Sequence, residues 1–236
     1  MRQIILDTET TGLEPTKGHR VIEIGLVEIV QRRRTGKHFH RYLNPDRDSD
    51  PGALQKHGLT TEFLADKPRF SDVVDEFLEF VQGAELVIHN AAFDIGFLNH
   101  ELKQLGRDPL SACCPQVIDT LMVARELHPG KRNTLDALCE RYGIDNSRRT
   151  FHGALLDAEL LGDVYLAMTR GQETLLMEAQ EQAPGTVKAA VRRPTQPLRV
   201  QYASLDELDE HMQQLEKIDQ ASKGQCLWKQ ALPTTS

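Results

Sequence analysis

The sequence predicts an α/β domain in which helices flank a mixed sheet, followed by a flexible linker and a short helical C-terminal tail. Strand-like apolar segments come first, and short apolar strands then alternate with amphipathic helices. After about residue 170 the composition becomes rich in proline and poor in large apolar residues, which is typical of a linker. We therefore expect a domain at 1–170, a linker at 171–197 and a tail at 198–236.

The N-terminal part is predicted to form three consecutive strands. The apolar run at residues 4–6 predicts a buried strand, and residues 21–30 predict a second. Thr35-Gly36 predicts a hairpin turn into a third strand at 37–43. Strands joined in this way run antiparallel, so this part of the sheet is expected to be a meander.

The pattern then alternates between strands and helices. Ser71 is predicted to cap an amphipathic helix whose apolar stripe includes Phe77 and Val81. A helix is expected after Asp94. Short strands are predicted at 86–88 and 117–119, and further helices at 121–127, 134–142 and 153–168.

Four carboxylates and one histidine occur in three short segments near the ends of these predicted elements. Asp7 and Glu9 follow a strand, and because side chains alternate along a strand they emerge on the same face. Asp94 follows another strand, and His152 precedes Asp157 by five residues. Each segment alone has a plainer interpretation: a solvated rim for Asp7 and Glu9, or a helix cap for Asp94. Together, in this order, they predict a site for Mg²⁺ or Mn²⁺, which prefer such oxygen ligands.

These segments resemble those of the proofreading 3′–5′ exonucleases of the Asp-Glu-Asp-Asp class with a catalytic histidine, and the resemblance extends to Cys226-Leu227-Trp228. It implies a ribonuclease H-like fold and a metal-dependent 3′–5′ exodeoxyribonuclease. It also implies that Asp7, Glu9, Asp94 and Asp157 bind metal and that His152 is the general base. Members often carry a Glu before a His-Gly pair. Here that region is Pro51-Gly52-Ala53, so only His57 is transferred as a substrate contact.

Hydrolysis of a phosphodiester with two metal ions about 3.5–4 Å apart would assign each residue a role. Asp7 is expected to bridge the ions, Glu9 and Asp157 to complete the ion that carries the attacking water, and Asp94 to hold the second. His152 can accept a proton near neutral pH. The expected substrate contacts are Asp7, Glu9, Thr10, His57 and Asp157, and the expected substrate is a single-stranded or frayed DNA 3′ end.

Composition limits how this protein could hold DNA. The chain has 236 residues, 39% of them hydrophobic, and a net charge of −7, which predicts weak and transient contact with DNA. Arg32-Arg33-Arg34 is expected at a solvated hairpin tip, whereas Arg148-Arg149, just before His152, is a candidate phosphate contact. The four cysteines have neither zinc nor disulfide spacing, and no leader or membrane span is indicated. We expect a cytoplasmic protein of the nucleoid-associated replisome.

The tail is predicted to bind the catalytic subunit of the replicative polymerase. Ser204-x-x-Glu207 is a capping box that opens a helix. About forty residues cannot bury an apolar stripe unaided, so it must either fold back on the domain or dock on a partner. The candidate docking residues are Leu205, Leu208, Met212, Leu215, Ile218 and Trp228.

Four further interpretations remain open. Residues 172–177 resemble the family's peptide for the sliding clamp, with Gln172, Leu175 and Met177 as anchors of a weak interaction; the alternative is a helix end. A small accessory subunit on the domain is compatible with the sequence. An exoribonuclease of RNA maturation could use the same site, although it would not need the linker and tail, and the intact carboxylate set argues against a non-catalytic scaffold.

Overall fold

The computed structural model describes residues 1–147, 149, 151–170, 203–222, 224, 226 and 228. The chain divides into two units, Met1–Gln182 and Ala183–Ser236, and each is described by itself. The predicted linker at 171–197 and the predicted clamp anchors Gln172, Leu175 and Met177 lie outside the described residues. Those interpretations therefore stay predictions.

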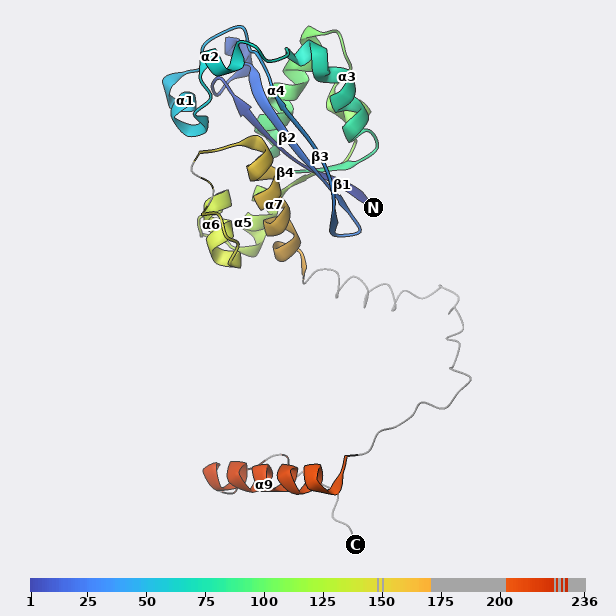
Figure 1. The fold of residues 1–236 in the computed structure, drawn as a ribbon, viewed down its shortest axis with the longest axis vertical. Helices are drawn as coiled ribbons and strands as arrows, with labels where there is room; N and C mark the ends of the chain where they lie inside the picture. The colour runs from blue at the N-terminus through green and yellow to red at the C-terminus, as the bar shows by residue number, and fades with distance from the viewer. Residues whose placement is uncertain are drawn as a thin grey trace, which may run out of the picture. The chain divides into compact units, whose positions relative to one another are not determined.

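The first unit is built on a five-stranded mixed sheet with the strand order β3-β2-β1-β4-β5 (Figure 1). The first three strands form an antiparallel meander, whereas β4 runs parallel to β1 and β5 runs parallel to β4. This confirms the mixed sheet expected from the sequence. The strands are β1 (Arg2–Thr10), β2 (Val21–Val30), β3 (Arg33–Tyr42), β4 (Glu85–Ile88) and β5 (Val117–Asp119).

Helices cover both faces of the sheet. Alternation along β1 sends Ile4 and Leu6 into a core cluster with α3 and α4, and sends Ile5 into a second cluster with α7. A third cluster packs α5 and α6 against α7. The helices are α1 (Pro51–His57), α2 (Thr61–Leu64), α3 (Phe70–Val81), α4 (Ala91–Gln104), α5 (Thr120–Leu127), α6 (Leu135–Tyr142) and α7 (Ala154–Met168), with 3-10 turns at Pro15–Lys17 and Leu110–Ala112.

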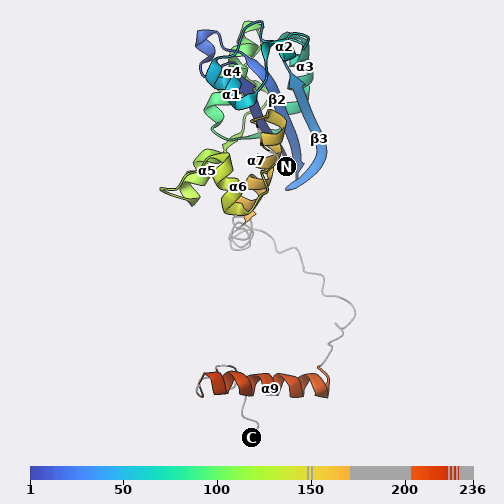
Figure 2. The ribbon, with the colours of Figure 1, turned by 60° about the vertical axis from the view of Figure 1, so that its left-hand side comes forward.

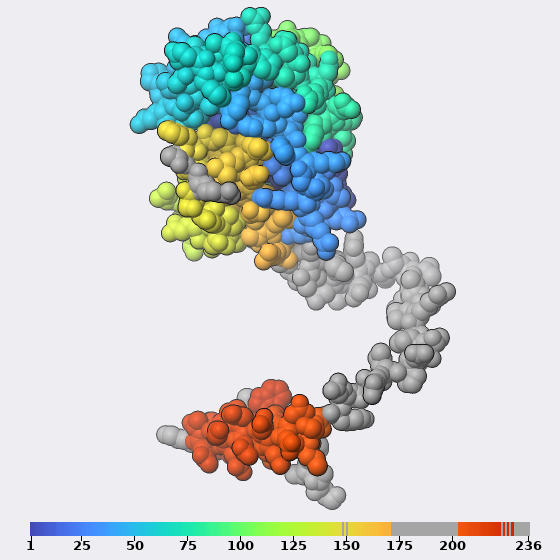
Figure 3. Space-filling model, in the orientation of Figure 1, coloured from blue at the N-terminus to red at the C-terminus, as the bar shows by residue number. Residues whose placement is uncertain are grey.

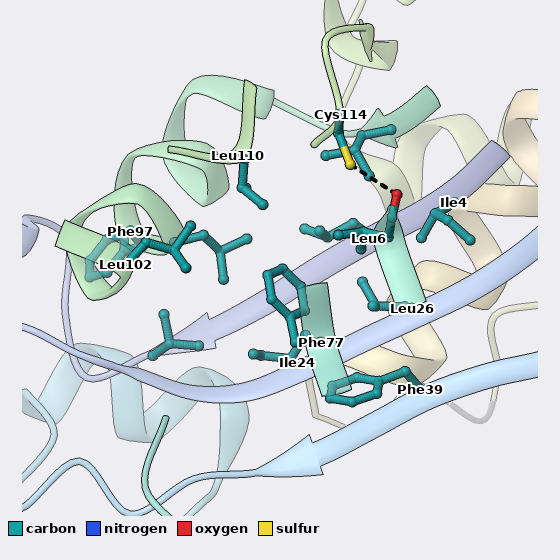
Figure 4. Close-up of a cluster of buried hydrophobic side chains, with 14 of the residues drawn as sticks. Ile4, Leu6, Ile24, Leu26, Phe39, Phe77, Phe97, Leu102, Leu110 and Cys114 are labelled. Carbon is teal, nitrogen blue, oxygen red and sulfur yellow. Dashed lines mark hydrogen bonds between the residues drawn. The ribbon is translucent and has the colours of Figure 1, made fainter. Parts of the chain in front are cut away.

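The main core lies between the sheet and helices α3 and α4 (Figure 4). Phe77 and Phe97 from the two helices are fully enclosed there with Leu6 and Leu26 from the central strands. Cys114 closes one end of this cluster, and its thiol donates to the Val81 carbonyl at 3.0 Å. The cysteine is therefore a packing residue, which agrees with the absence of zinc or disulfide spacing in the sequence.

Helix α7 packs on β1 and β2 at the other face of the sheet (Figure 2), and the space-filling view shows its surface beside that of the β2–β3 hairpin (Figure 3). Arg34 of β3 forms an ion pair with Asp163 of α7 at 2.9 Å. The hairpin therefore helps to hold the helix that carries Asp157.

The structure corrects two local predictions. The hairpin turn is at Gln31 and Arg32, whose φ values of 49° and 60° give a tight two-residue connection, and Gly36 at φ 85° instead forms an irregularity inside β3. Ser71 does not cap α3. The helix begins at Phe70, whose ring is buried in the core, and its cap is Arg69, two residues before the predicted one.

The second unit contains α9 (Leu205–Ala221), which opens with the predicted capping box: Glu207 N donates to Ser204 Oγ at 3.3 Å. After the helix the chain turns back, and Cys226 N donates to the Asp219 carboxylate at 3.2 Å. Leu215 and Cys226 are buried, so Leu215 does not belong to the exposed stripe. Within the described residues, no helix is long and apolar enough to cross a membrane.

Candidate active site

The site begins at the end of β1, where Asp7 and Glu9 point to the same face of the sheet as Ile5. That face is covered by α7, as the predicted alternation along the strand requires. Both side chains are half-buried and line a cavity of about 890 Å³. The two carboxylates therefore lie side by side in a sheltered but accessible place.

A glycine allows Asp157 to join them. Gly25 of β2 pairs with Asp7, and a Cβ at Gly25 would lie 2.2 Å from the carbonyl carbon of Ala154, the first residue of α7. Only glycine permits so close an approach of helix and sheet. The first turn of α7 therefore lies directly over β1 and β2 and carries Asp157, which is 3% exposed, into the site.

Asp94 arrives from the opposite face of the sheet. It lies in the first turn of α4, not at the cap, and its Oδ1 accepts hydrogen bonds from Thr8 N and Thr8 Oγ1 at 3.1 and 2.7 Å. The N-cap residue of α4 is Asn90, and the carboxylate of Asp119 at the end of β5 accepts hydrogen bonds from Asn90 N and Ala91 N. The interpretation of Asp94 as a helix cap is therefore wrong, and its side chain lines the active-site cavity instead.

Electrostatics show that the cluster is short of positive charge. Burial, followed by repulsion from Asp94 and Glu9, raises the pKa of Asp7 well above its ordinary value. Burial and the charge of Asp157 raise the pKa of Glu9 to about 8, and burial raises the pKa of Asp94 to about 7. Such carboxylates ionise together only if cations join them, which is the behaviour of a metal-binding set.

One cation that the sequence did not single out for this place is Arg149. Its Nε and Nη2 atoms each donate to Asp157 at 2.6 Å, and its Nη1 donates to Asp136 at 2.6 Å. The side chain is only 7% exposed. The basic pair Arg148-Arg149 was expected to contact phosphate; Arg148 lies outside the described residues, and Arg149 here neutralises a carboxylate. No signal in the sequence spacing indicates that pairing.

His152 lies at the mouth of the cluster and is 45% exposed. Its Nδ1 is 3.5 Å from Asp157 Oδ2 and 2.9 Å from Arg149 Nη2. Because a guanidinium can only donate, Nδ1 must carry a lone pair in this arrangement. Burial and the nearby Arg149 charge lower the pKa of His152 below its ordinary value, which keeps the imidazole neutral near pH 7.

The other predicted substrate contacts, Thr10 and His57, line the same cavity. Thr10 Oγ1 donates to the Gly12 carbonyl at 2.6 Å. His57 is buried, and its Nδ1 accepts from Leu59 N at 3.0 Å, but its Nε2 has no hydrogen-bond partner in the described part of the chain. A buried polar atom without a partner beside a cavity is suited to contact a ligand.

The donor set fits divalent metal ions. Ligand atoms of Glu9, His152 and Asp157 all lie within 4.8 Å of one another, and Asp7 and Asp94 line the same cavity. Three of the four carboxyl groups have raised pKa values. Carboxylate oxygens are the hard ligands that Mg²⁺ and Mn²⁺ prefer. Arg149 occupies this cluster as its counter-charge, so metal binding has to compete with the guanidinium.

Arg149→Met should therefore destabilise the metal-free protein by about 3–5 kcal/mol, the usual cost of leaving a buried carboxylate without its partner. Mn²⁺ should remove most of that loss, because it supplies the missing charge to Asp157. Thermal unfolding in EDTA and in Mn²⁺ measures both effects. The control is Arg107→Met, which breaks an exposed pair with Asp75 and should cost at most about 1 kcal/mol. Equal melting temperatures of wild type and Arg149→Met in EDTA would contradict the counter-charge role.

Comparison with known proteins agrees with this geometry. Residues 4–165 match the family model described as "Exonuclease". Among solved structures, Exonuclease X in complex with 5′ overhanging duplex DNA matches with a TM-score of 0.57 and 25% identity, over 72% of this chain and 93% of that one. The nuclease domain of 3′hExo, a DEDDh family member bound to rAMP, has the same fold, with a TM-score of 0.62 and 18% identity over 72% and 92% of the two chains. Fold and site together define an exonuclease of the ribonuclease H-like class.

Curated relatives show which exonuclease family the chain belongs to. DNA polymerase III subunit epsilon of Salmonella typhimurium is 53% identical and that of Escherichia coli is 52% identical, each over 97% of both chains. The chain belongs to the DNA polymerase III epsilon subunit family. The expected family, fold and 3′–5′ exonuclease activity are thereby confirmed.

Proposed function

We propose that this chain removes the terminal nucleotide from mispaired DNA 3′ ends by a two-metal hydrolysis at the Asp7 cavity. The observation that carries the proposal is the convergence of four carboxylates, three of them with raised pKa values, from β1, α4 and α7. Asp7 would bridge the two ions, Glu9 and Asp157 would complete one of them, and Asp94 would hold the other. Divalent ions bound there lower the pKa of the attacking water and neutralise charge on the phosphate.

The protein's own groups would orient the substrate and move the proton. His152 accepts the proton of the attacking water at a ring nitrogen, beside Arg149 and Asp157, which lie 2.9 and 3.5 Å from its Nδ1. The new P–O bond forms as the bond to the 3′ oxygen of the next nucleotide breaks, and that oxygen leaves as a hydroxyl after taking up a proton. His57 Nε2 and the backbone near Thr10 would hold the terminal nucleotide in the cavity.

Selectivity for mispaired ends is proposed to come from fraying. The cavity, at about 890 Å³, has room for a terminal nucleotide, and the proposal is that the strand end must separate from its partner to enter it. A mispaired end needs less unstacking energy, by a few kcal/mol at most, and therefore reaches the site more often. No contact that reads the base is required for this preference.

The decisive experiment compares 5′-labelled single-stranded DNA and RNA of one sequence, with Mg²⁺, with Mn²⁺ and with EDTA. Stepwise shortening of DNA from its 3′ end, abolished by EDTA, is the expected result. Faster shortening of RNA would favour the exoribonuclease alternative, and no shortening of either would favour the scaffold alternative. The names of the relatives, which belong to a DNA polymerase, support DNA.

The tail is proposed to bind the polymerase catalytic subunit. Leu208, Met212 and Ile218 are each 48% exposed along α9, and Leu205 and Trp228 are 81% and 72% exposed. Large apolar side chains with one Trp are typical of an interface hot spot. Tethering through the linker would raise the effective concentration of the primer end into the millimolar range, roughly, which offsets weak DNA binding.

Residues 1–180 alone should remain an active exonuclease on single strands but lose association with the polymerase subunit. In the full chain, Trp228→Ala should weaken that association by about 2 kcal/mol or more. Calorimetric titration measures the affinity, and Leu215→Ala is the comparison, because Leu215 is buried in the tail unit and should act through tail stability. A truncated chain that binds the polymerase as tightly as the full chain would overturn the proposal.

A weak clamp contact and an accessory subunit on the domain remain predictions.

A further inference from the structure

A second cavity adjoins the proposed active site. It has a volume of about 490 Å³ and lies at the junction of α5 and α6. His89 and Thr134 line both cavities, so the two share a wall. Its cationic lining residues are Arg125 and Lys131, and the neighbouring Arg132 lines the active-site cavity.

None of these three cations has a carboxylate partner among the described residues. Elsewhere the basic side chains are commonly neutralised, as in the pairs Arg41–Glu76 and Arg107–Asp75. All three side chains are exposed. In a chain with a net charge of −7, an unpaired cationic cluster beside an acidic site is a selective place for an anion.

The loop that carries Lys131 and Arg132 is held in shape without using their charges. Arg141 of α6 donates to the Arg132 carbonyl at 2.7 Å and to Asn133 Oδ1 at 3.0 Å. Lys131 N donates to the His128 carbonyl at 3.2 Å, which closes the turn. A fixed backbone with free charged side chains is suited to bind a ligand with little ordering cost.

We infer that this second cavity binds the phosphodiester backbone of the single strand on the 5′ side of the terminal nucleotide. The inference rests on the proposed function, because it needs the terminal nucleotide in the Asp7 cavity. A strand that leaves the Asp7 cavity over the wall formed by His89 and Thr134 reaches Arg125 and Lys131. Phosphate contacts of this kind position a strand without reading its sequence, as a proofreading enzyme requires.

The test compares two substrates of the full-length protein. The p-nitrophenyl ester of thymidine 5′-monophosphate fills only the terminal-nucleotide cavity, whereas oligothymidylates of two to twelve residues can also reach the second cavity. The test variant is Arg125→Gln with Lys131→Gln. Its matched control is Arg33→Gln with Lys37→Gln, which removes an exposed Arg and Lys from the β2–β3 hairpin, away from both cavities.

The test variant should raise KM for the longer oligonucleotides roughly tenfold at low salt and leave kcat/KM for the ester at the wild-type value. The salt dependence of oligonucleotide binding should become less steep by about 1.4 in log–log slope, because each single-strand phosphate that the protein no longer neutralises reduces the slope by about 0.7. The control variant should match wild type on both substrates. Melting temperatures of both variants check that the fold is kept.

Each other outcome overturns the inference in a distinguishable way. Unchanged oligonucleotide KM in the test variant would exclude the second cavity but leave the exonuclease intact. Equal losses on ester and oligonucleotide would mean that Arg125 and Lys131 act on the terminal nucleotide. An equal effect of the control variant would mean that the change in KM comes from the lost positive charge of the whole protein and not from the second cavity. If the wild type hydrolyses neither substrate, the proposed function itself fails.

Discussion

Asp7→Ala is expected to abolish exonuclease activity and to leave the fold intact. Asp7 interacts electrostatically with all the other carboxylates of the site, since the charges of Asp94, Glu9 and Asp157 all raise its pKa. Without it, the proposed bridge between two metal ions has no ligand. Activity on single-stranded DNA at saturating Mg²⁺ is the measurement, and Asp7→Asn is the matched variant, which keeps the size of the side chain and removes its charge. Retention of more than a few per cent of wild-type activity would contradict the metal assignment.

The same substitution should stabilise the metal-free protein near pH 8. A carboxyl whose pKa is raised by folding contributes stability below its ordinary pKa of about 4, and that stability is lost as pH rises through the folded-state pKa. The values of about 8 for Glu9 and about 7 for Asp94 place the loss between about pH 4 and 8. The melting temperature of the wild type in EDTA should therefore fall across this range, less steeply in Asp7→Ala, and Mn²⁺ should reverse the fall.

His152→Ala should lower kcat by about 10²- to 10⁴-fold, the loss expected for a missing general base. The lowered pKa of His152 means that the neutral imidazole is already present near pH 6.5, so the wild-type rate should rise with pH below that value and then level off. The variant should lose this part of the pH profile. His38→Ala, at an exposed hairpin position, should behave as wild type.

Metal affinity separates the two roles that geometry allows for His152. Its ring lies close enough to Glu9 and Asp157 to share an ion with them, and it is also placed to accept a proton. A general base predicts a nearly unchanged Mn²⁺ affinity in His152→Ala, measured by electron paramagnetic resonance of free Mn²⁺. A large loss of affinity, or a pH profile like that of the wild type, would reassign the residue.

The sequence by itself determined the features that depend on local spacing. The bounds of β2 and β5 agree with the predicted strands at 21–30 and 117–119, because an apolar run between polar or turn residues leaves little freedom in where a strand begins and ends. Alternation along β1 was enough to place Asp7 and Glu9 on one face. The capping box of α9 was predicted for the same reason, since its two hydrogen bonds join residues only three apart.

Only the tertiary structure decided which distant groups meet. Nothing in the spacing shows that Arg149 neutralises Asp157, that Asp119 of β5 accepts a hydrogen bond from the first residue of α4, or that Leu215 is buried after the chain turns back. Gly25 could have been an ordinary strand residue; its importance appears only when the backbone of α7 is seen against it. Long-range contacts depend on how whole elements pack, and packing is set by complementary surfaces brought together from many positions, which no short segment contains.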